Sequence, residues 1–131
     1  MHGDVKPGNM FLMGDGVPAF IDWQYTAIGK GVQDLAFMLI EGYDVATCAA
    51  LEPTIKAAYH AALLAEGVAD YPMEQLERDW QLATLHFPFY VAMWFGTTPD
   101  EELVDPSFPR RFVPRAFEAI LRHGAHKLLP Q

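Results

Sequence analysis

The segment Gly14-Asp15-Gly16 is the feature that most constrains the fold, because it separates two short apolar runs near the start of the chain. These runs read NMFLM over residues 9–13 and VPAFID over residues 17–22. Glycine and the Asp-Gly pair tolerate the positive φ angles that tight hairpin turns require. The pattern therefore predicts a short β-hairpin, with Pro18 at the start or edge of its second strand.

From Val32 onward, the spacing of apolar residues becomes helical. Leu35, Leu39 and Ile40 fall on one face of a helix, and Gly42 is a suitable residue to end it. The sequence therefore predicts a change from hairpin to helix at about residue 32.

Three further helical regions are expected, over residues 46–66, over residues 72–95, and from Pro109 or Pro114 towards Leu129. Pro53 is expected to interrupt the first of them and to mark a new first turn. Pro88 is expected to kink or divide the second. The fold class is therefore α+β and mainly α, with a short hairpin followed by four or five helices.

Size and composition limit the classes of protein to consider. At 131 residues the chain is long enough for one domain with a real core. Its net charge of −8, with only nine Lys and Arg residues, argues against nucleic-acid binding. The most apolar run, residues 83–96, is short for a membrane span and predicts a buried helix. Cys48 is the only cysteine, which indicates a reducing, cytoplasmic location.

Three polar residues lie at the open end of the predicted hairpin or lead into it. Asn9 opens the first strand and Asp22 closes the second, so a tight hairpin brings an amide oxygen and a carboxylate together. Such oxygen ligands suit a hard cation such as Mg²⁺. Asp4 lies on the loop that leads into Asn9, where it can accept a proton from a hydroxyl nucleophile. A base and metal ligands in one cleft are the parts of a phosphoryl-transfer site.

The stretch HGDVKPGN (residues 2–9), followed by IDWQ (residues 21–24), resembles two segments of the aminoglycoside phosphotransferase and choline kinase-like family. These are its catalytic loop and its metal-binding segment, and the family is related to the protein kinases. Its pattern is His-Gly-Asp, four residues, Asn, and then an apolar strand that ends in Ile-Asp. A later Gly…Asp-Leu-Ala segment of the family corresponds here to GKGVQDLAF, residues 29–37.

The resemblance implies a role for each matching residue of the catalytic machinery. Asp4 is implied to be the catalytic base that orients the acceptor hydroxyl. Asn9 and Asp22 are implied to be the Mg²⁺ ligands that bridge the phosphates of ATP. Lys6 matches a lysine that meets the transferred phosphate in many protein kinases, where a cation offsets charge on the γ-phosphoryl group. The alternative for Lys6 is an exposed, solvated side chain.

Three more residues are implied to support the loop. His2 and Gly3 shape it, and Asp34 is a structural carboxylate that accepts hydrogen bonds from the catalytic-loop backbone. The implied function is an ATP-dependent kinase that phosphorylates a hydroxyl group of a small molecule, with Mg²⁺ and ATP bound.

Kinase-like folds also have an N-terminal nucleotide lobe, and no such lobe precedes residue 1. Residues 1–131 are therefore expected to be the C-terminal lobe alone, nearly inactive by itself. We expect apolar surface where the absent lobe would sit, which favours a homodimer.

Two other functions stay open at this point. One is a protein kinase lobe, although Trp23-Gln24 replaces the Phe-Gly that follows the metal-binding Asp of protein kinases, and no Ala-Pro-Glu segment follows. The other is a non-catalytic, self-associating interaction module derived from a kinase lobe. The intact Asp4, Asn9 and Asp22 argue against this interaction module, whereas the absent nucleotide lobe argues for it.

Overall fold

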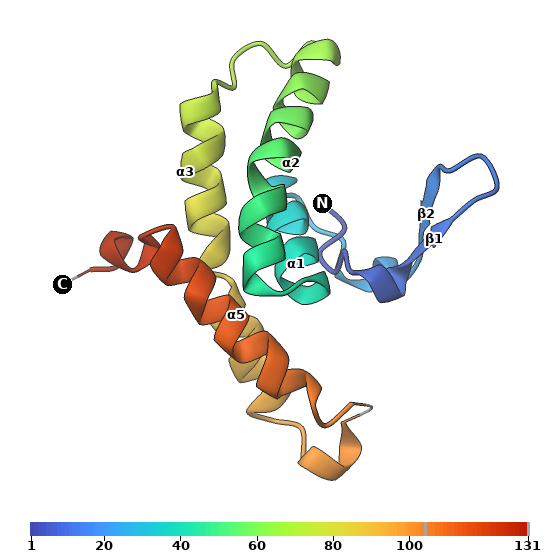
Figure 1. Cartoon of the computed structure of the whole chain (residues 1–131), viewed down its shortest axis with the longest axis vertical. Coiled ribbons are helices and arrows are strands. Elements are labelled where there is room, and N and C mark those ends of the chain that lie inside the picture. Colours follow the sequence, from blue (N-terminus) through green and yellow to red (C-terminus); the bar gives the residue numbers. More distant parts are fainter. Residues whose placement is uncertain (104, 131) are drawn as a thin grey trace.

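A computed structural model describes residues 1–103 and 105–130 and consists of a two-stranded hairpin that projects from a helical body (Figure 1). Strand β1 (Met10–Leu12) pairs antiparallel with β2 (Pro18–Phe20), with Met10 opposite Phe20. The turn is closed by a hydrogen bond from the Met13 amide to the Val17 carbonyl, 3.0 Å long. The predicted hairpin and the α+β, mainly α fold class are confirmed.

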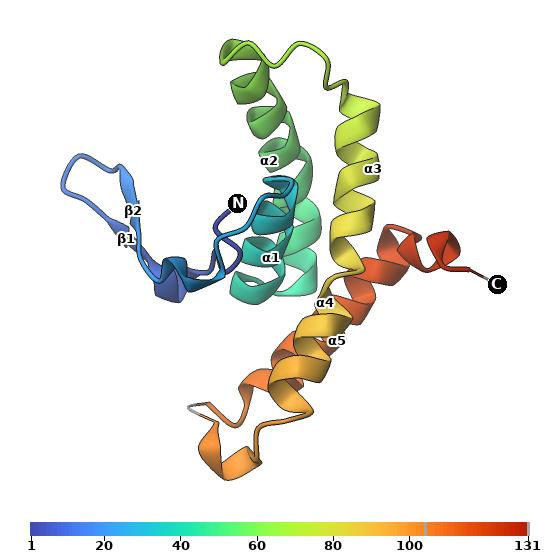
Figure 2. The ribbon, with the colours of Figure 1, turned by 180° about the vertical axis from the view of Figure 1, so that it is seen from behind.

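The helical body is built from five α-helices and one short π-helix among the described residues. They are α1 (Val32–Gly42), α2 (Val45–Ala65), α3 (Met73–Thr84), α4 (Phe87–Tyr90), the π-helix Val91–Phe95 and α5 (Phe108–Arg122). Single 3₁₀ turns occupy Pro7–Asn9, Trp23–Tyr25, Asp100–Glu102 and Ala125–Leu128. Helices α2 and α3 lie side by side, and α5 runs across their lower ends (Figures 1 and 2). The N-terminal segment lies along α1 before it enters the hairpin (Figure 2).

The prediction that Pro53 interrupts the helix over residues 46–66 was wrong, because α2 continues through Pro53. Proline lacks the amide that would bond to the carbonyl of Ala49, four residues earlier. Pro53 is exposed, so water can bond to that carbonyl and the helix is kept. The helix ends where predicted, since Gly67 adopts a φ of +86° and the Val68 amide donates to the Leu63 carbonyl.

The region 72–95 is divided as predicted, with Pro88 in the first turn of α4. The expectation of one buried helix over residues 83–96 was wrong, because Phe89 and Trp94 are exposed. Helix α5 also ends earlier than predicted, at Arg122, since Gly124 adopts the left-handed conformation and a 3₁₀ turn follows. Among the residues that the structure describes, no helix combines the length and apolar character that crossing a membrane requires.

Helix α1 is central to the core and packs against α2, α3 and α5. Its buried side chains meet aromatic residues from the α3–α4 region and α5 in one cluster. The largest side chains of this cluster with almost no exposure are Trp80, Phe87, Leu39 and Leu76. The N-terminal segment therefore lies against the helix at the centre of the core (Figure 2).

A buried charge cluster joins α2, α3 and α5. The Glu52 carboxylate contacts Lys56 at 2.6 Å, Arg122 at 2.7 Å and His123 at 3.0 Å, and its side chain is only 7% exposed. Lys56 also contacts Glu77 at 2.7 Å and lies over the Trp80 ring, 4.8 Å from its centroid. This cluster has no counterpart in the sequence predictions.

Candidate active site

The Asp4 carboxylate presents two different oxygen atoms. Its Oδ2 accepts hydrogen bonds from the Lys6 ammonium at 2.7 Å and from the Asn9 amide at 2.9 Å. Its Oδ1 accepts no hydrogen bond from the described residues. No buried side-chain oxygen among these residues lacks a hydrogen-bond partner, so Oδ1 must be in contact with solvent. Asp4 as a residue is nevertheless only 6% exposed. The loop therefore fixes one carboxylate oxygen and leaves the other accessible to solvent.

Asn9 is held in a matching way by the 3₁₀ turn Pro7–Asn9. Its Nδ2 donates to both the backbone carbonyl and the carboxylate of Asp4. Because both partners are acceptors, the amide orientation is determined by chemistry. The remaining Oδ1 accepts no hydrogen bond within the described residues and also contacts solvent.

Asp22 lies beside Asn9 at the open end of the hairpin. The amide of its neighbour Ile21 donates to the Asn9 carbonyl at 3.0 Å, which extends the pairing beyond the strands. Asp22 adopts φ 65° and ψ 59°, the left-handed conformation, and within residues 1–103 and 105–130 no other non-glycine residue has a positive φ. Its carboxylate is exposed and makes no hydrogen bond or ion pair to another described side chain. Such backbone strain is typical of functional positions.

His2 links the loop to the second strand. Its Nδ1 accepts from the Asp4 amide at 3.3 Å, and its Nε2 lies 2.9 Å from the Ile21 carbonyl. Because Nδ1 is an acceptor, the proton belongs on Nε2, which donates to Ile21. The Trp23 ring packs on the imidazole, with centroids 4.5 Å apart. The neutral imidazole therefore bridges the segments that carry Asp4 and Asp22.

Asp34, in the first turn of α1, holds the other side of the loop. Its two carboxylate oxygens accept from the His2 amide at 2.7 Å and the Gly3 amide at 2.8 Å. Gly3 has a φ of +88°, and a Cβ there would overlap the carbonyl oxygen of Tyr25. A side chain is therefore excluded at this position by both conformation and space.

The sequence analysis did not predict that Glu41, in the last turn of α1, would lie near Asp4. Burial raises the pKa of its carboxyl group, the negative charge of Asp4 adds to this, and Lys6 and Arg115 oppose it. A half-buried glutamate on a helix has no sequence pattern that would indicate this proximity. The site therefore contains a further carboxyl group that is easier to protonate than usual.

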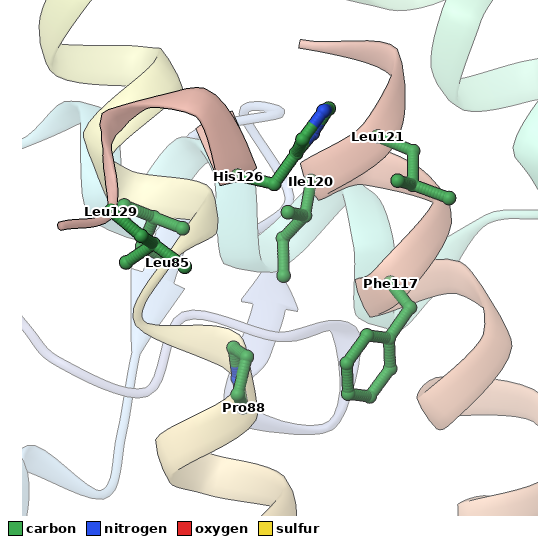
Figure 3. Close-up of a pocket in the computed structure, with 7 residues that line it drawn as sticks. All are labelled: Leu85, Pro88, Phe117, Ile120, Leu121, His126 and Leu129. Atoms are coloured by element: carbon green, nitrogen blue, oxygen red, sulfur yellow. The ribbon is translucent and has the colours of Figure 1, made fainter. Parts of the chain in front are cut away.

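An apolar pocket of about 390 Å³ lies away from these residues, between the start of α4, helix α5 and the C-terminal 3₁₀ turn (Figure 3). Leu85, Pro88, Phe117 and Leu129 are among the side chains around it. None of the predicted site residues lines this pocket. The predicted site residues instead lie on the loop beside α1 and at the open end of the hairpin.

Comparison with known families indicates a phosphotransferase of the kinase-like class. A sequence model of the phosphotransferase enzyme family, APH, matches residues 1–76. The match covers more than half of the chain, so the chain belongs to this family. No curated protein and no solved structure matches it.

Proposed function

We propose that this chain carries the catalytic loop of an ATP-dependent phosphotransferase that moves the γ-phosphoryl group to a hydroxyl of a small molecule. In this proposal the chain is the C-terminal, catalytic-loop lobe of the kinase-like fold. The observation that supports it most strongly is the Asp4 carboxylate, with Oδ2 held by Lys6 and Asn9 and Oδ1 open. An open, oriented carboxylate oxygen is what a general base needs in order to receive a hydroxyl proton.

The residues around Asp4 have complementary roles in this proposal. Oδ1 accepts the proton of the acceptor hydroxyl and orients its oxygen toward the γ-phosphorus. Lys6 holds Asp4 and keeps a positive charge next to the position of the transferred group. His2 and Asp34 keep the loop in place through its backbone. Positioning and charge stabilisation, rather than covalent catalysis, carry a phosphoryl transfer.

Asn9 and Asp22 fit a divalent cation such as Mg²⁺. Their donor atoms are an amide oxygen and a carboxylate that no described residue uses, and such hard oxygen ligands are what Mg²⁺ prefers. Mg²⁺ binds proteins through one or two such groups and takes the rest of its shell from water and substrate phosphates. When bound, the ion supplies positive charge that offsets the phosphates of ATP.

A metal titration tests this assignment independently of turnover. Adding Mn²⁺, a paramagnetic substitute for Mg²⁺, together with ATP is expected to broaden the NMR signals of the Asn9 and Asp22 amides before those of α3. Asp22→Asn removes the charged ligand and is expected to weaken the effect by about tenfold in metal concentration. Asp15→Asn, which removes a carboxylate at the other end of the same hairpin, is the matched control. Equal broadening in Asp22→Asn and Asp15→Asn would mean that the ion does not bind at Asp22.

We also propose that the hairpin surface pairs with a second copy of the chain. Its apolar side chains are unusually exposed, notably Phe11, Leu12 and Val17, at 56%, 77% and 57%. Each strand has one edge that no other described strand covers, and such edges readily pair with a further strand. A two-stranded ribbon is also only marginally stable by itself, so pairing would stabilise it.

Sedimentation equilibrium provides the test of this association. The wild-type chain is expected to dimerise, and Leu12→Lys is expected to raise the dimer dissociation constant by about tenfold or more, because it places a charge in an apolar contact. Leu64→Lys, at an exposed leucine near the end of α2, serves as the control and should leave the constant unchanged. A monomeric wild type, or an equal effect of both variants, would contradict the proposal.

A further inference from the structure

We propose that Tyr90 is a positioning residue that holds the peptide group between Gly3 and Asp4 and so orients the Asp4 carboxylate. This inference rests on the proposed function of Asp4 as the base of a phosphoryl transfer. It assigns a role to a residue 87 positions from its partner in the sequence and outside the segment that carries the family motifs.

The contact itself is short and buried. The Tyr90 hydroxyl donates to the Gly3 carbonyl oxygen at 2.6 Å, and Tyr90 is only 9% exposed. Gly3 is buried as well. Water therefore has little access to compete for this carbonyl, and the hydrogen bond is correspondingly costly to lose.

The position of this carbonyl in the backbone gives the contact its consequence. The Gly3 carbonyl and the Asp4 amide belong to one planar peptide group, on opposite edges of it. Tyr90 binds the carbonyl edge, and Nδ1 of His2 accepts from the amide edge. Rotation of this peptide plane would move the Asp4 Cα and its side chain, and so change the direction in which Oδ1 points. The two hydrogen bonds together fix that rotation.

Gly3 makes such an external constraint necessary. Without a Cβ, glycine has more backbone freedom than any other residue, and Gly3 already occupies a positive φ. Asp34 binds the amides of His2 and Gly3 but leaves the next peptide group unconstrained. Tyr90 supplies the contact that this peptide group needs.

Tyr90 is itself held firmly and keeps its proton. Its ring packs against Phe37 and edge-on against His86, with centroids 5.0 and 4.9 Å away. Burial, with a smaller contribution from the negative charges of Asp4 and Asp34, raises the pKa of Tyr90 to about 12. The hydroxyl therefore remains a hydrogen-bond donor throughout the neutral pH range.

Tyr90→Phe removes this hydroxyl and keeps the ring that packs in the core. In a protein that combines this chain with a nucleotide lobe, we expect kcat for phosphoryl transfer to fall about fivefold to tenfold, which matches the loss of one hydrogen bond. KM for ATP and for the acceptor should stay within about twofold. Hydrogen exchange of the Asp4 amide, measured by NMR, is expected to accelerate by a similar factor. Tyr59→Phe is the matched control, because the Tyr59 hydroxyl makes no hydrogen bond to a described residue.

The two measurements separate this inference from the proposed function. If Asp4 exchange is the same in Tyr90→Phe and Tyr59→Phe, Tyr90 does not hold the loop and the inference is wrong, whatever the turnover. Faster exchange with an unchanged kcat would leave Tyr90 as a purely structural residue and would also overturn it. If a protein that combines this chain with a nucleotide lobe transfers no phosphoryl group to any alcohol tested, the proposed function fails, and the exchange rates alone decide whether Tyr90 fixes the peptide.

Discussion

In a protein that combines this chain with a nucleotide lobe, Asp4→Asn is expected to lower kcat for phosphoryl transfer by about 10³-fold, while the dissociation constant of Mg·ATP stays within about twofold of the wild-type value. The side chain keeps its shape, so the loop should keep its fold. The amide oxygen can still accept from Lys6 and Asn9, as Oδ2 does now. The amide NH₂ group then occupies the position of Oδ1 and donates a hydrogen bond where a proton acceptor is required.

Transfer of labelled phosphate from ATP to a panel of small alcohols measures the effect, and calorimetry measures nucleotide binding. Asp70→Asn, at an exposed carboxylate in the loop between α2 and α3, is the matched control and should retain wild-type turnover. Turnover close to that of the wild type in Asp4→Asn would mean that Asp4 is not the base. Loss of ATP binding together with turnover would mean that Asp4 acts in binding rather than in the chemical step.

The hairpin and the position of the first helix could be predicted because their determinants are local. The Gly-Asp-Gly segment selects a tight turn, and the turn alone brings Asn9 close to Ile21. Pro53 shows where local rules fail. Its cost to a helix depends on whether water reaches the carbonyl that it leaves without a donor, and that depends on which face of α2 is exposed.

In the candidate site, too, contacts between residues close in the sequence could be predicted, and contacts between distant residues could not be predicted from spacing. The contacts among Asp4, Lys6 and Asn9 span at most five residues, within reach of motif reasoning. The contacts of Asp34 with His2 and Gly3 span 32 and 31 residues, and only the family resemblance indicated them. Spacing in the sequence contains no information about such a pair until the fold is known.

Two long-range features had no sequence signal. Tyr90 belongs to an aromatic stretch typical of a core, and nothing in that stretch identifies an acceptor for its hydroxyl. Glu52 contacts Arg122 and His123, which follow it by 70 and 71 residues. A glutamate four residues before a lysine on a helix normally indicates an exposed pair. Here Trp80 and Glu77 of α3 and the end of α5, at Arg122 and His123, cover that pair.

The buried charge cluster gives the second large expectation, that Glu52→Gln lowers the free energy of unfolding by about 3 kcal/mol at pH 7. Glutamine keeps the size of the side chain but leaves Arg122 and His123 facing a neutral amide whose NH₂ group cannot accept from them. Lys56 keeps Glu77 and Arg122 keeps Glu118, so the loss is partial. Urea denaturation followed by circular dichroism measures it, and Glu66→Gln, at an exposed position after α2, should change stability little.

The pH dependence of the same variant distinguishes loss of charge from loss of packing. Burial alone would raise the pKa of Glu52, but hydrogen bonds from His123, Lys56 and Arg122 outweigh it and lower the pKa from 4.5 to about 2. A lowered pKa contributes stability that is fully present above pH 4.5 and is lost as the pH falls towards 2. This lowering corresponds to about 3 kcal/mol. The stability difference between wild type and Glu52→Gln should therefore shrink towards zero as the pH falls from about 4.5 to about 2. A difference that persists at pH 2 would instead assign the effect of Glu52 to packing.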